Sequence, residues 1–305
     1  MLSEQVVHVR RFNRLVTQRA GALNDEYLGR ERPLGHSRVL YEIGPQGADL
    51  RELRSRLALD SGYLSRIVQS LVAAGLVELQ IGPDDERIRR AVFTDAGLAE
   101  FGEMDRRSDE VAAAYLAPLS ESQRTRLVGS MSEVHQLLRA AGTAIERVDP
   151  TCRAARWCLG QYYEELISRF DAGFDPARSI PAAEDEMRPP LGAFLVAGVD
   201  GEWVACGAIR TVAPGVGYIK RMWVSSTVRG LGIGRRMLAA LEAEGAALGM
   251  ATIQLETNRA LPEAIQLYLS SGYTERTPFN NEIYAHHWFE KRLAAAPSPS
   301  APPQP

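Results

Sequence analysis

The sequence predicts a two-domain protein, with a mainly helical N-terminal domain followed by an α+β C-terminal domain. The chain has 305 residues, which is about twice the usual ~150 residues of a single domain. Apolar residues recur with helical spacing in the first half, whereas short strand-like runs alternate with helical patterns in the second. A glycine-rich stretch, residues 229–236, lies between one such strand-like run and a long helical pattern.

We expect the first domain to cover residues 1–147, a linker to cover residues 148–151 and the second domain to cover residues 152–293. Pro150 favours an extended conformation in the residue before it, so it marks the joint. The remaining residues, 294–305, are mostly Ala, Pro and Ser, and this composition predicts a disordered tail.

The composition is that of an ordinary globular protein, with 45% hydrophobic and 24% charged residues. A net charge of −3 provides no overall basic field, so nucleic-acid binding would need a local patch. The three cysteines lack paired C-x-x-C spacing, which indicates a reduced, cytoplasmic chain without a metal site. No apolar run approaches the ~20 residues of a membrane span.

Apolar residues with seven-residue periodicity occur at both ends of the first domain. The first set is Leu2, Val6, Val9, Val16, Ala20 and Leu23, with Asn13 in the missing position, and the second is Leu127, Met131, Val134, Leu138 and Ala141. This pattern predicts two long helices that form a homodimer interface. The alternative is that both seams pack within one monomer.

Between these helices, the spacing predicts two shorter ones joined by a tight turn. Leu50, Leu53 and Leu57 space the first, which is expected to start near Ala48, and Asp60 or Ser61 caps the second, which ends at Gly75. A helix-turn-helix is an arrangement that reads DNA. The outward side of the second helix carries the hydrogen-bonding residues Tyr63, Ser65, Arg66, Gln69 and Ser70.

A strand, turn and returning strand follow at residues 76–81, 82–85 and 88–94. The returning strand carries Arg87, Arg89 and Arg90. Such a hairpin beside a recognition helix is a wing, whose arginines can contact phosphates or enter a minor groove.

These motifs resemble the MarR-type winged-helix regulators. The matching residues are Ser65-Arg66, Gly75-Leu76-Val77, Asp85-x-Arg87 and Phe93-Thr94-Asp95-Ala96-Gly97, within about residues 1–142. The resemblance implies a homodimer that binds a palindromic double-stranded DNA operator. It assigns DNA contacts to Ser61, Tyr63, Ser65, Arg66, Gln69, Arg87 and Arg89.

The second domain begins with an amphipathic pattern, and we assign its apolar stripe to core packing; the stripe is Leu159, Tyr162, Tyr163, Leu166, Ile167 and Phe170. Mainly strands are then expected until the glycine-rich stretch. Strands are predicted at residues 191–199, 203–212, 217–224, 251–257 and 283–291. One helix is predicted after the glycine-rich stretch, and another at residues 262–269.

The glycines at positions 230, 232 and 234 predict an anion-binding loop, because backbone N–H groups at a helix start can face a phosphate. A dinucleotide fingerprint is excluded because Arg235 stands where its third glycine is needed, and no Gly-Lys-Ser/Thr ending marks a P-loop.

The remaining pattern, Arg229-x-x-Gly232-x-Gly234, resembles the GNAT family of N-acetyltransferases. The resemblance implies a GNAT fold with a central mixed sheet, and acetyl-CoA as the acyl donor. It assigns cofactor contacts to Met222, Trp223, Val224, Arg229, Gly230, Leu231, Gly232, Ile233, Gly234, Arg235 and Asn258.

The resemblance also assigns Tyr268 as the hydrogen-bond donor to the leaving thiolate. Relatives often carry a glutamate on the strand before the loop, but residues 217–221 here read Gly-Tyr-Ile-Lys-Arg. Glu256 on the following strand is the nearest substitute base, and the alternative is proton transfer through a chain of waters. The acceptor would be an amine of a small molecule or a protein.

The sequence therefore predicts a DNA-binding regulator that is also an acetyl-CoA-dependent N-acetyltransferase. One alternative is a regulator whose GNAT domain only senses acetyl-CoA or an amine. Another is an acetyltransferase whose winged helix serves only as a dimer scaffold.

Overall fold

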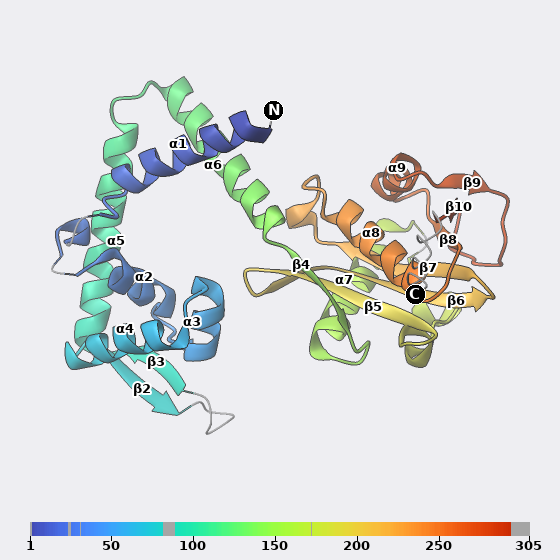
Figure 1. Cartoon of the computed structure of the whole chain (residues 1–305), viewed down its shortest axis with the longest axis horizontal. Helices are drawn as coiled ribbons and strands as arrows, with labels where there is room; N and C mark the ends of the chain where they lie inside the picture. Colours follow the sequence, from blue (N-terminus) through green and yellow to red (C-terminus); the bar gives the residue numbers. More distant parts are fainter. Residues whose placement is uncertain (1, 24–25, 31, 82–88, 172, 294–305) are drawn as a thin grey trace, which may run out of the picture. The chain divides into compact units, whose positions relative to one another are not determined.

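The computed structural model describes residues 2–23, 26–30, 32–81, 89–171 and 173–293 (Figure 1). The predicted tail at 294–305 and the predicted wing turn at 82–85 lie outside the described residues. The chain divides into two compact units, Met1–Ser130 and Met131–Pro305. Within the described residues, no helix is long and apolar enough to cross a membrane.

The first unit is mainly helical, with one small three-stranded sheet. Its elements are α1 (Leu2–Arg19), η1 (Tyr27–Gly29), α2 (Leu34–Ile43), β1 (Ala48–Asp49), α3 (Leu50–Leu57), α4 (Ser61–Ala73), β2 (Val77–Ile81), β3 (Arg89–Phe93), α5 (Asp95–Leu116) and α6 (Glu121–Ala141), which continues into the second unit. Helices α2, α3 and α4 bury one apolar core that includes Leu40, Leu53 and Leu71.

The predicted helix-turn-helix is formed by α3 and α4. Ala58 adopts a left-handed conformation (φ 49°) that turns the chain, and the Asp60 carboxylate accepts a hydrogen bond from Tyr63 N at 2.9 Å to cap α4. Strands β2 and β3 pair antiparallel with Leu79 opposite Ala91, as the predicted wing requires. The winged helix-turn-helix architecture is therefore confirmed.

Two elements of the first unit differ from the prediction. Residues 48–49 were expected to begin a helix, but they form β1, which pairs with β3, and α3 starts only after the Asp49 cap. Helix α2 was not predicted at all, although its residues Val39, Leu40 and Ile43 are fully or almost fully buried. Its apolar spacing is too short to stand out in a ten-residue segment.

Helix α1 leaves its predicted seam uncovered within this chain. None of its residues is buried against the rest of the described chain, and Leu2, Val6, Val9 and Val16 are all at least 46% exposed. An apolar face of this size on a single helix is a surface that another polypeptide could cover.

The second unit is an α+β domain around a seven-stranded mixed sheet. Its strands are β4 (Ala144–Val148), β5 (Gly192–Val199), β6 (Glu202–Ala213), β7 (Val216–Val224), β8 (Thr252–Thr257), β9 (Thr274–Arg276) and β10 (His287–Arg292), in the order β4-β5-β6-β7-β8-β10-β9. Its helices are α7 (Arg153–Arg169), η2 (Pro176–Arg178), η3 (Glu184–Met187), η4 (Ser226–Val228), α8 (Ile233–Ala247) and α9 (Pro262–Ser270). Only β7 and β8 pair in parallel within the described sheet, through the β7–α8–β8 crossover.

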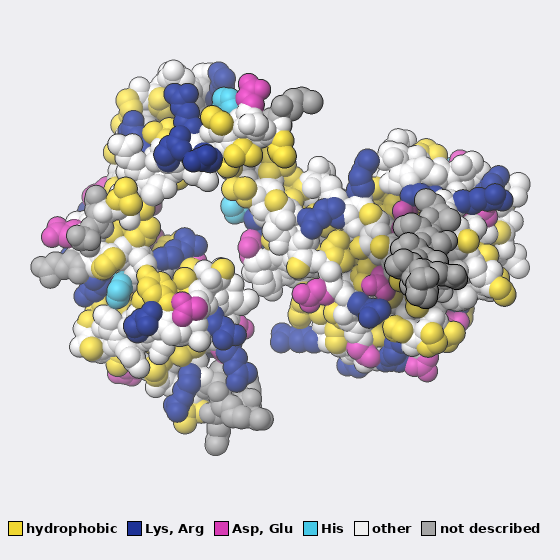
Figure 2. Space-filling model, in the orientation of Figure 1, with side chains coloured by type: hydrophobic (Ala, Val, Ile, Leu, Met, Phe, Trp, Pro, Cys, Tyr) yellow, Lys and Arg dark blue, Asp and Glu magenta, His cyan; other side chains and the backbone are white. Residues whose placement is uncertain are grey.

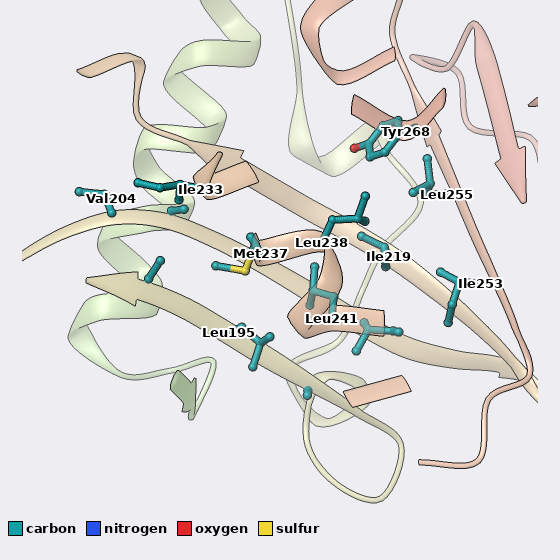
Figure 3. Packing of buried hydrophobic residues seen from close by; sticks show 14 of the residues in the cluster. Leu195, Val204, Ile219, Ile233, Met237, Leu238, Leu241, Ile253, Leu255 and Tyr268 are labelled. Carbon is teal, nitrogen blue, oxygen red and sulfur yellow. The ribbon is translucent and has the colours of Figure 1, made fainter. Parts of the chain in front are cut away.

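Alternating side chains of β5 send one set to each face of this sheet. Ala193 and Leu195 join the core beneath α8, whereas Phe194 and Val196 join a second cluster beneath α7. Figure 3 shows the first core, in which Met237, Leu238 and Leu241 of α8 lie among the strand residues. The two helices therefore cover opposite faces of the sheet.

Residues 144–147 were expected at the end of the first domain, and residue 148 at the start of the linker at 148–151. In the structure they form β4, the edge strand of the second sheet, with Glu146 opposite Val196. The last turn of α6 contacts α8 of the second unit, because Arg236 of α8 donates to the carbonyls of Ala140 and Thr143, the latter at 2.6 Å. The alternation in 144–148 is too short to identify an edge strand from the sequence.

The last strand also differs from its predicted bounds, because β10 begins at His287 rather than at residue 283. Residues 283–286 instead turn toward the carboxyl end of β8, where His286 N donates to Thr257 O at 2.9 Å. This turn brings Tyr284 near the functional site.

We predict that Gly97→Ala destabilises the first unit, because an added Cβ would lie 2.0 Å from the carbonyl oxygen of Leu76, a backbone atom that cannot rotate away. Overpacking of this kind costs about 1–3 kcal/mol. Gly102→Ala, on the same helix with nothing within 4 Å of its Cβ, should be neutral or stabilising.

All four tryptophans, Trp157, Trp203, Trp223 and Trp288, lie in the second unit, so fluorescence follows that unit while circular dichroism also reports the first. Urea titration of Gly97→Ala should shift the dichroism transition and leave the fluorescence transition in place. Equal stability of the two glycine variants would contradict the packing described for Gly97.

Candidate active site

The site begins where the two parallel strands stop pairing. Strands β7 and β8 pair at only three positions, the last being Tyr218 opposite Gln254, although β7 continues to Val224. The β6–β7 register shifts at the same level, between Cys206 and Ala208, and Arg221 there has a positive φ of 56°. Beyond Tyr218, one edge of β7 is therefore left without a paired strand in the described sheet.

A cavity of about 400 Å³ fills this gap, within the usual range of a small-molecule site. It is lined from β7, the glycine loop and the two helices α7 and α9. The lining residues are Tyr162, Glu165, Leu166, Met222, Trp223, Val224, Val228, Arg229, Gly230, Gly232, Gly234, Arg235, Leu261, Glu263, Ala264, Gln266, Leu267, Tyr268 and Ser270.

The glycine loop opens α8 at the wall of this cavity. Gly230 (φ 78°) and Gly232 (φ 82°) both have the left-handed conformation that glycine tolerates best, and Gly232 is the N-cap of α8. An added Cβ at either position would meet no described atom within 4 Å, so both face open space. The N-terminal N–H groups of α8 are thus accessible to an anion.

Arg229 is held by neighbouring acceptors at the edge of the loop. Its guanidinium donates to Val224 O at 3.0 Å and forms ion pairs with Glu165 and, at 3.7 Å, with Glu263. Glu165 also accepts from Trp223 Nε1 at 3.0 Å. Arg229 therefore ties the loop to α7 and α9.

A second, smaller cavity of about 90 Å³ lies beside the first. Six residues line both cavities, and these are Tyr162, Leu166, Met222, Leu261, Ala264 and Tyr268. The remaining lining of the smaller cavity is Phe170, Phe174, Ser179, Ile219, Lys220, Arg221, Glu256, Thr257, Asn258, Glu282, Tyr284 and Ala285.

Tyr268 thus lies where the two cavities meet. Its ring packs in the core beside Leu255 and Phe289, with the Phe289 ring centroid at 5.7 Å (Figure 3). Burial raises the pKa of its phenol above the ordinary value, and the nearby Glu256 charge adds to this effect. The hydroxyl is therefore a protonated donor at neutral pH, and no described residue hydrogen-bonds to it.

Glu256 lines the smaller cavity with its carboxylate almost buried. It accepts hydrogen bonds from the Tyr218 hydroxyl and, at 3.4 Å, from Asn280 Nδ2, and Lys220 Nζ lies 3.7 Å away. Burial raises the pKa of Glu256 above its usual value of about 4.5, and these three partners oppose the rise without cancelling it.

Glu282 lies on the other side of Lys220, at 3.1 Å from Nζ, with the opposite pKa shift. Burial would raise the pKa of Glu282, but hydrogen bonds from Ser179 Oγ (2.7 Å) and Ile180 N (2.8 Å) and the Lys220 charge hold it below the usual value. Two carboxyl groups around one ammonium therefore differ in their affinity for protons. Of the two, Glu256 is the carboxyl group with the higher affinity for a proton.

The predicted cofactor residues do not all lie in the larger cavity. Leu231 and Ile233 turn their side chains into the core instead, with Ile233 almost fully buried. Asn258 lies at the smaller cavity, and its amide is used within the chain, donating to Tyr284 O and accepting from Ala260 N. The other eight line the larger cavity, namely Met222, Trp223, Val224, Arg229, Gly230, Gly232, Gly234 and Arg235.

The sequence prediction missed the acidic residues Glu165, Glu263 and Glu282 and the cation Lys220. Glu165 and Arg229 are 64 positions apart, so local spacing cannot reveal their ion pair. Tyr162 and Leu166 were assigned to a packing stripe, but both also line the two cavities. Among the described residues, no group of three or more His, Cys, Asp or Glu side chains could hold a metal ion.

In the first unit, the described side chains among those predicted for DNA contact are exposed on α4 and β3. Ser61, Ser65 and Gln69 line a shallow cavity of about 260 Å³ together with Arg51 and Arg54 of α3. Arg66 and Arg89 are also exposed, and several Arg side chains lie over this part of the unit (Figure 2).

Two of the residues predicted to contact DNA, Tyr63 and Arg87, differ from the others. Tyr63 turns partly toward α2, because its hydroxyl oxygen lies 2.9 Å from where a Cβ on Gly35 would be. Arg87 lies outside the described residues.

Comparison with known proteins agrees with both halves of the structure. The family model for the acetyltransferase (GNAT) family matches residues 159–273, and the model for the MarR family matches residues 29–88. A curated protein of Azospirillum brasilense, named IAA acetyltransferase, is 44% identical over 121 residues, which are 39% of this chain and 78% of that protein. The chain belongs to the GNAT acetyltransferase family. It carries a MarR family domain before the acetyltransferase domain, and the acetyltransferase domain makes it an enzyme.

Solved structures also resemble each half. A proposed acyl-CoA N-acyltransferase from Klebsiella pneumoniae is 27% identical, covers 50% of this chain and 98% of its own, and has a TM-score of 0.41. Apo MarR from E. coli is 21% identical, covers 41% of this chain and 94% of its own, and has a TM-score of 0.37. GNAT proteins use acetyl-CoA, and MarR proteins bind DNA as dimers.

We predict opposite effects of pH on the stabilities of Glu256→Gln and Glu263→Gln. Since the folded-state pKa of Glu256 is raised, its contribution to wild-type stability is present below about pH 4.5 and is lost as pH rises through the folded-state pKa. Glu256→Gln should therefore gain stability relative to wild type as pH rises. A hydrogen bond from Arg169 lowers the pKa of Glu263, so Glu263→Gln should lose relative stability as pH rises.

Urea unfolding followed by tryptophan fluorescence at several pH values measures both differences in the same domain. Parallel pH trends for the two variants would contradict the assignment of Glu256 as the carboxyl group with the raised pKa.

Proposed function

We propose that the second domain transfers the acetyl group of acetyl-CoA to an amine. The observation that carries this proposal is the pair of cavities that meet at Tyr268, one beneath an anion-binding glycine loop and the other containing Glu256. The cofactor would occupy the larger cavity, with its pyrophosphate at the start of α8 and its pantetheine arm along the free edge of β7. The amine would approach through the smaller one.

In this mechanism Glu256 accepts a proton from the incoming ammonium, and the neutral nitrogen attacks the thioester carbonyl. Tyr268 donates a hydrogen bond to the sulfur as the C–S bond breaks. Since a phenol has a higher pKa than a thiol, Tyr268 acts mainly by hydrogen bonding rather than by complete proton transfer. Its raised pKa strengthens that conclusion.

We predict that Tyr268→Phe lowers kcat about 100-fold, because one donor to developing negative charge is worth about that much. The affinity for acetyl-CoA should change by less than about threefold, since most of the cavity lining is unchanged. Tyr273→Phe is the matched control, because Tyr273 lies in the same core, 6.0 Å from Tyr268 between ring centroids, but lines neither cavity.

Steady-state thiol release with a panel of amines measures kcat, and calorimetry measures acetyl-CoA affinity. Equal rates for the two variants would remove the assignment of Tyr268. Acetyl-CoA binding without any thiol release would favour the alternative in which this domain only senses its ligand.

We further propose that the first domain binds a palindromic operator as a homodimer. The exposed polar face of α4 would read bases, the wing arginines Arg87 and Arg89 would grip the backbone, and the apolar faces of α1 and α6 would cover each other in the dimer. The exposure of Leu2, Val6, Val9, Met131, Val134 and Leu138 supports this role for the two helices.

We predict that Arg66→Ala and Arg89→Ala weaken DNA binding in different ways. Arg66 on α4 should matter for one base position and cost about 1–3 kcal/mol there. Arg89 should contribute to all sequences alike, so its loss should reduce the slope of log K against log[salt] by about one.

The probe is the duplex that the wild-type protein selects from a random pool, titrated at several salt concentrations. Arg124→Ala on α6, outside the predicted DNA surface, serves as the control. Absence of any selected sequence would favour the alternative in which the winged helix is only a dimer scaffold.

A further inference from the structure

We infer that the acceptor is an α-amino acid with an aromatic side chain, whose carboxylate binds Arg221. This inference rests on the proposed acetyl transfer and specifies its substrate. Three features of the smaller cavity carry it, namely an arginine with which no carboxylate of the described chain pairs, a local pair of carboxylates around Lys220 and a cluster of aromatic rings.

Arg221 is held in a backbone conformation that its side chain does not favour. Its φ of 56° lies in the left-handed region, at the point where the β6–β7 register shifts. Such outliers persist where the surrounding structure fixes them, and they cluster at functional sites. The same bulge makes Arg221 part of the cavity lining.

The guanidinium of Arg221 has unused donors. It donates to Ala182 O at 3.1 Å and to Met187 Sδ at 3.5 Å, and no carboxylate of the described residues pairs with it. Since a guanidinium has five N–H donors in a planar fork, it can still bind a carboxylate through two parallel hydrogen bonds.

The other cation of the described cavity lining, Lys220, already has two acidic partners. Lys220 Nζ contacts Glu282 at 3.1 Å, Glu256 at 3.7 Å and Ile180 O at 2.9 Å. The ammonium is thus satisfied by groups of the chain, whereas Arg221 is the cation that a ligand can neutralise. Burying a charge without a partner is unfavourable, so the cavity favours an anionic group on the ligand.

An aromatic cluster lies on the α7 side of the same cavity. The rings of Phe174 and Tyr284 have centroids 4.8 Å apart, Tyr163 stacks on Phe174 at 6.0 Å and 17°, and Phe170 contacts both Phe174 and Tyr284. All four are partly exposed. A planar side chain of the acceptor could add to this cluster, and aromatic pairs attract beyond the effect of their buried area.

The size of the cavity fits the polar end of such a molecule. Its volume of about 90 Å³ is much smaller than the 400 Å³ of the larger cavity, so we assign to it the amine and the carboxylate rather than the whole acceptor. The side chain would therefore remain at the aromatic cluster. With the carboxylate on Arg221, the amine is directed toward Glu256 and Tyr268.

The transfer is balanced with these groups. The ammonium gives one proton to Glu256, which passes it to solvent, and the amine nitrogen attacks the thioester carbon. The C–N bond forms, the C–S bond breaks, and the second nitrogen proton ends on the sulfur. The products are an N-acetyl amino acid, CoA thiol and one proton.

The test compares L-phenylalanine, 2-phenylethylamine and L-alanine as acceptors for the full-length protein. The first two differ only in the carboxylate, and the first and third differ only in the ring. We expect kcat/KM for L-phenylalanine to exceed that for 2-phenylethylamine by about 10- to 100-fold, the usual value of a hydrogen bond to a charged group. The preference over L-alanine should be at least about tenfold.

Arg221→Gly removes the guanidinium and suits the left-handed backbone, so it should fold. It should reduce the ratio for L-phenylalanine over 2-phenylethylamine to near one, while Phe174→Ala should reduce the ratio for L-phenylalanine over L-alanine. Arg178→Gln, an exposed cation on the same α7–β5 connection that does not line the cavity, should keep both wild-type ratios.

A wild-type ratio near one for the carboxylate pair, or a ratio that Arg221→Gly leaves unchanged, would overturn the inference and leave acetyl transfer standing. If no thiol is released, calorimetry with L-phenylalanine in the presence of CoA distinguishes failure of the amino-acid site from failure of the proposed transfer. Arg221-dependent binding without thiol release would support the amino-acid site and refute the proposed transfer. Neither binding nor release would overturn both.

Discussion

The site in the acetyltransferase domain depends on one interruption of backbone pairing, between strands β7 and β8. Parallel strands β7 and β8 hold each other only as far as Tyr218 and Gln254, and the bulge at Arg221 bends β7 away. An unpaired strand edge in the middle of a sheet is unfavourable unless something covers it. Here both cavities lie along that edge, and the chain leads from its end directly into the glycine loop. One local irregularity therefore creates the space of both cavities and positions the N-terminus of α8.

The charged groups around the two cavities fix the positions of side chains more than they stabilise the fold. Burying Glu256, Lys220 and Glu282 together costs desolvation that their mutual attraction only partly offsets. What the cluster does provide is a difference in proton affinity between two nearby carboxyl groups. Glu165 has a comparable role at the larger cavity, since it links Arg229 and Trp223 to α7. The shape of the site is thus maintained by ion pairs between elements that are distant in the sequence.

This distribution explains which features the sequence could predict. The glycine loop and the helix-turn-helix depend on conformations and caps that neighbouring residues encode, such as Gly232 and Asp60, and both were identified. Helix α2 and strand β4 are too short for their periodicity to be distinctive, and both depend on packing against distant segments. The partners of Arg229 and the cavity position of Arg221 also arise only from tertiary contacts. Sequence patterns therefore identified the glycine-loop side of the site better than the residues of the smaller cavity.

The last turn of α6 contacts the start of α8. Arg236, in the first turn of α8 just after the glycine loop, donates to the carbonyls of Ala140 and Thr143, and Arg139 pairs with Asp200 and Glu202. The final turn of α6 is thereby fixed to the same helix start that would hold a pyrophosphate. If ligand binding shifts that helix start, the shift must reach α6 directly, because the contact is made by adjacent residues rather than through a flexible segment. If the first domain binds DNA as proposed, and ligand binding changes its affinity for DNA by some factor, linkage requires DNA binding to change the ligand affinity by the same factor.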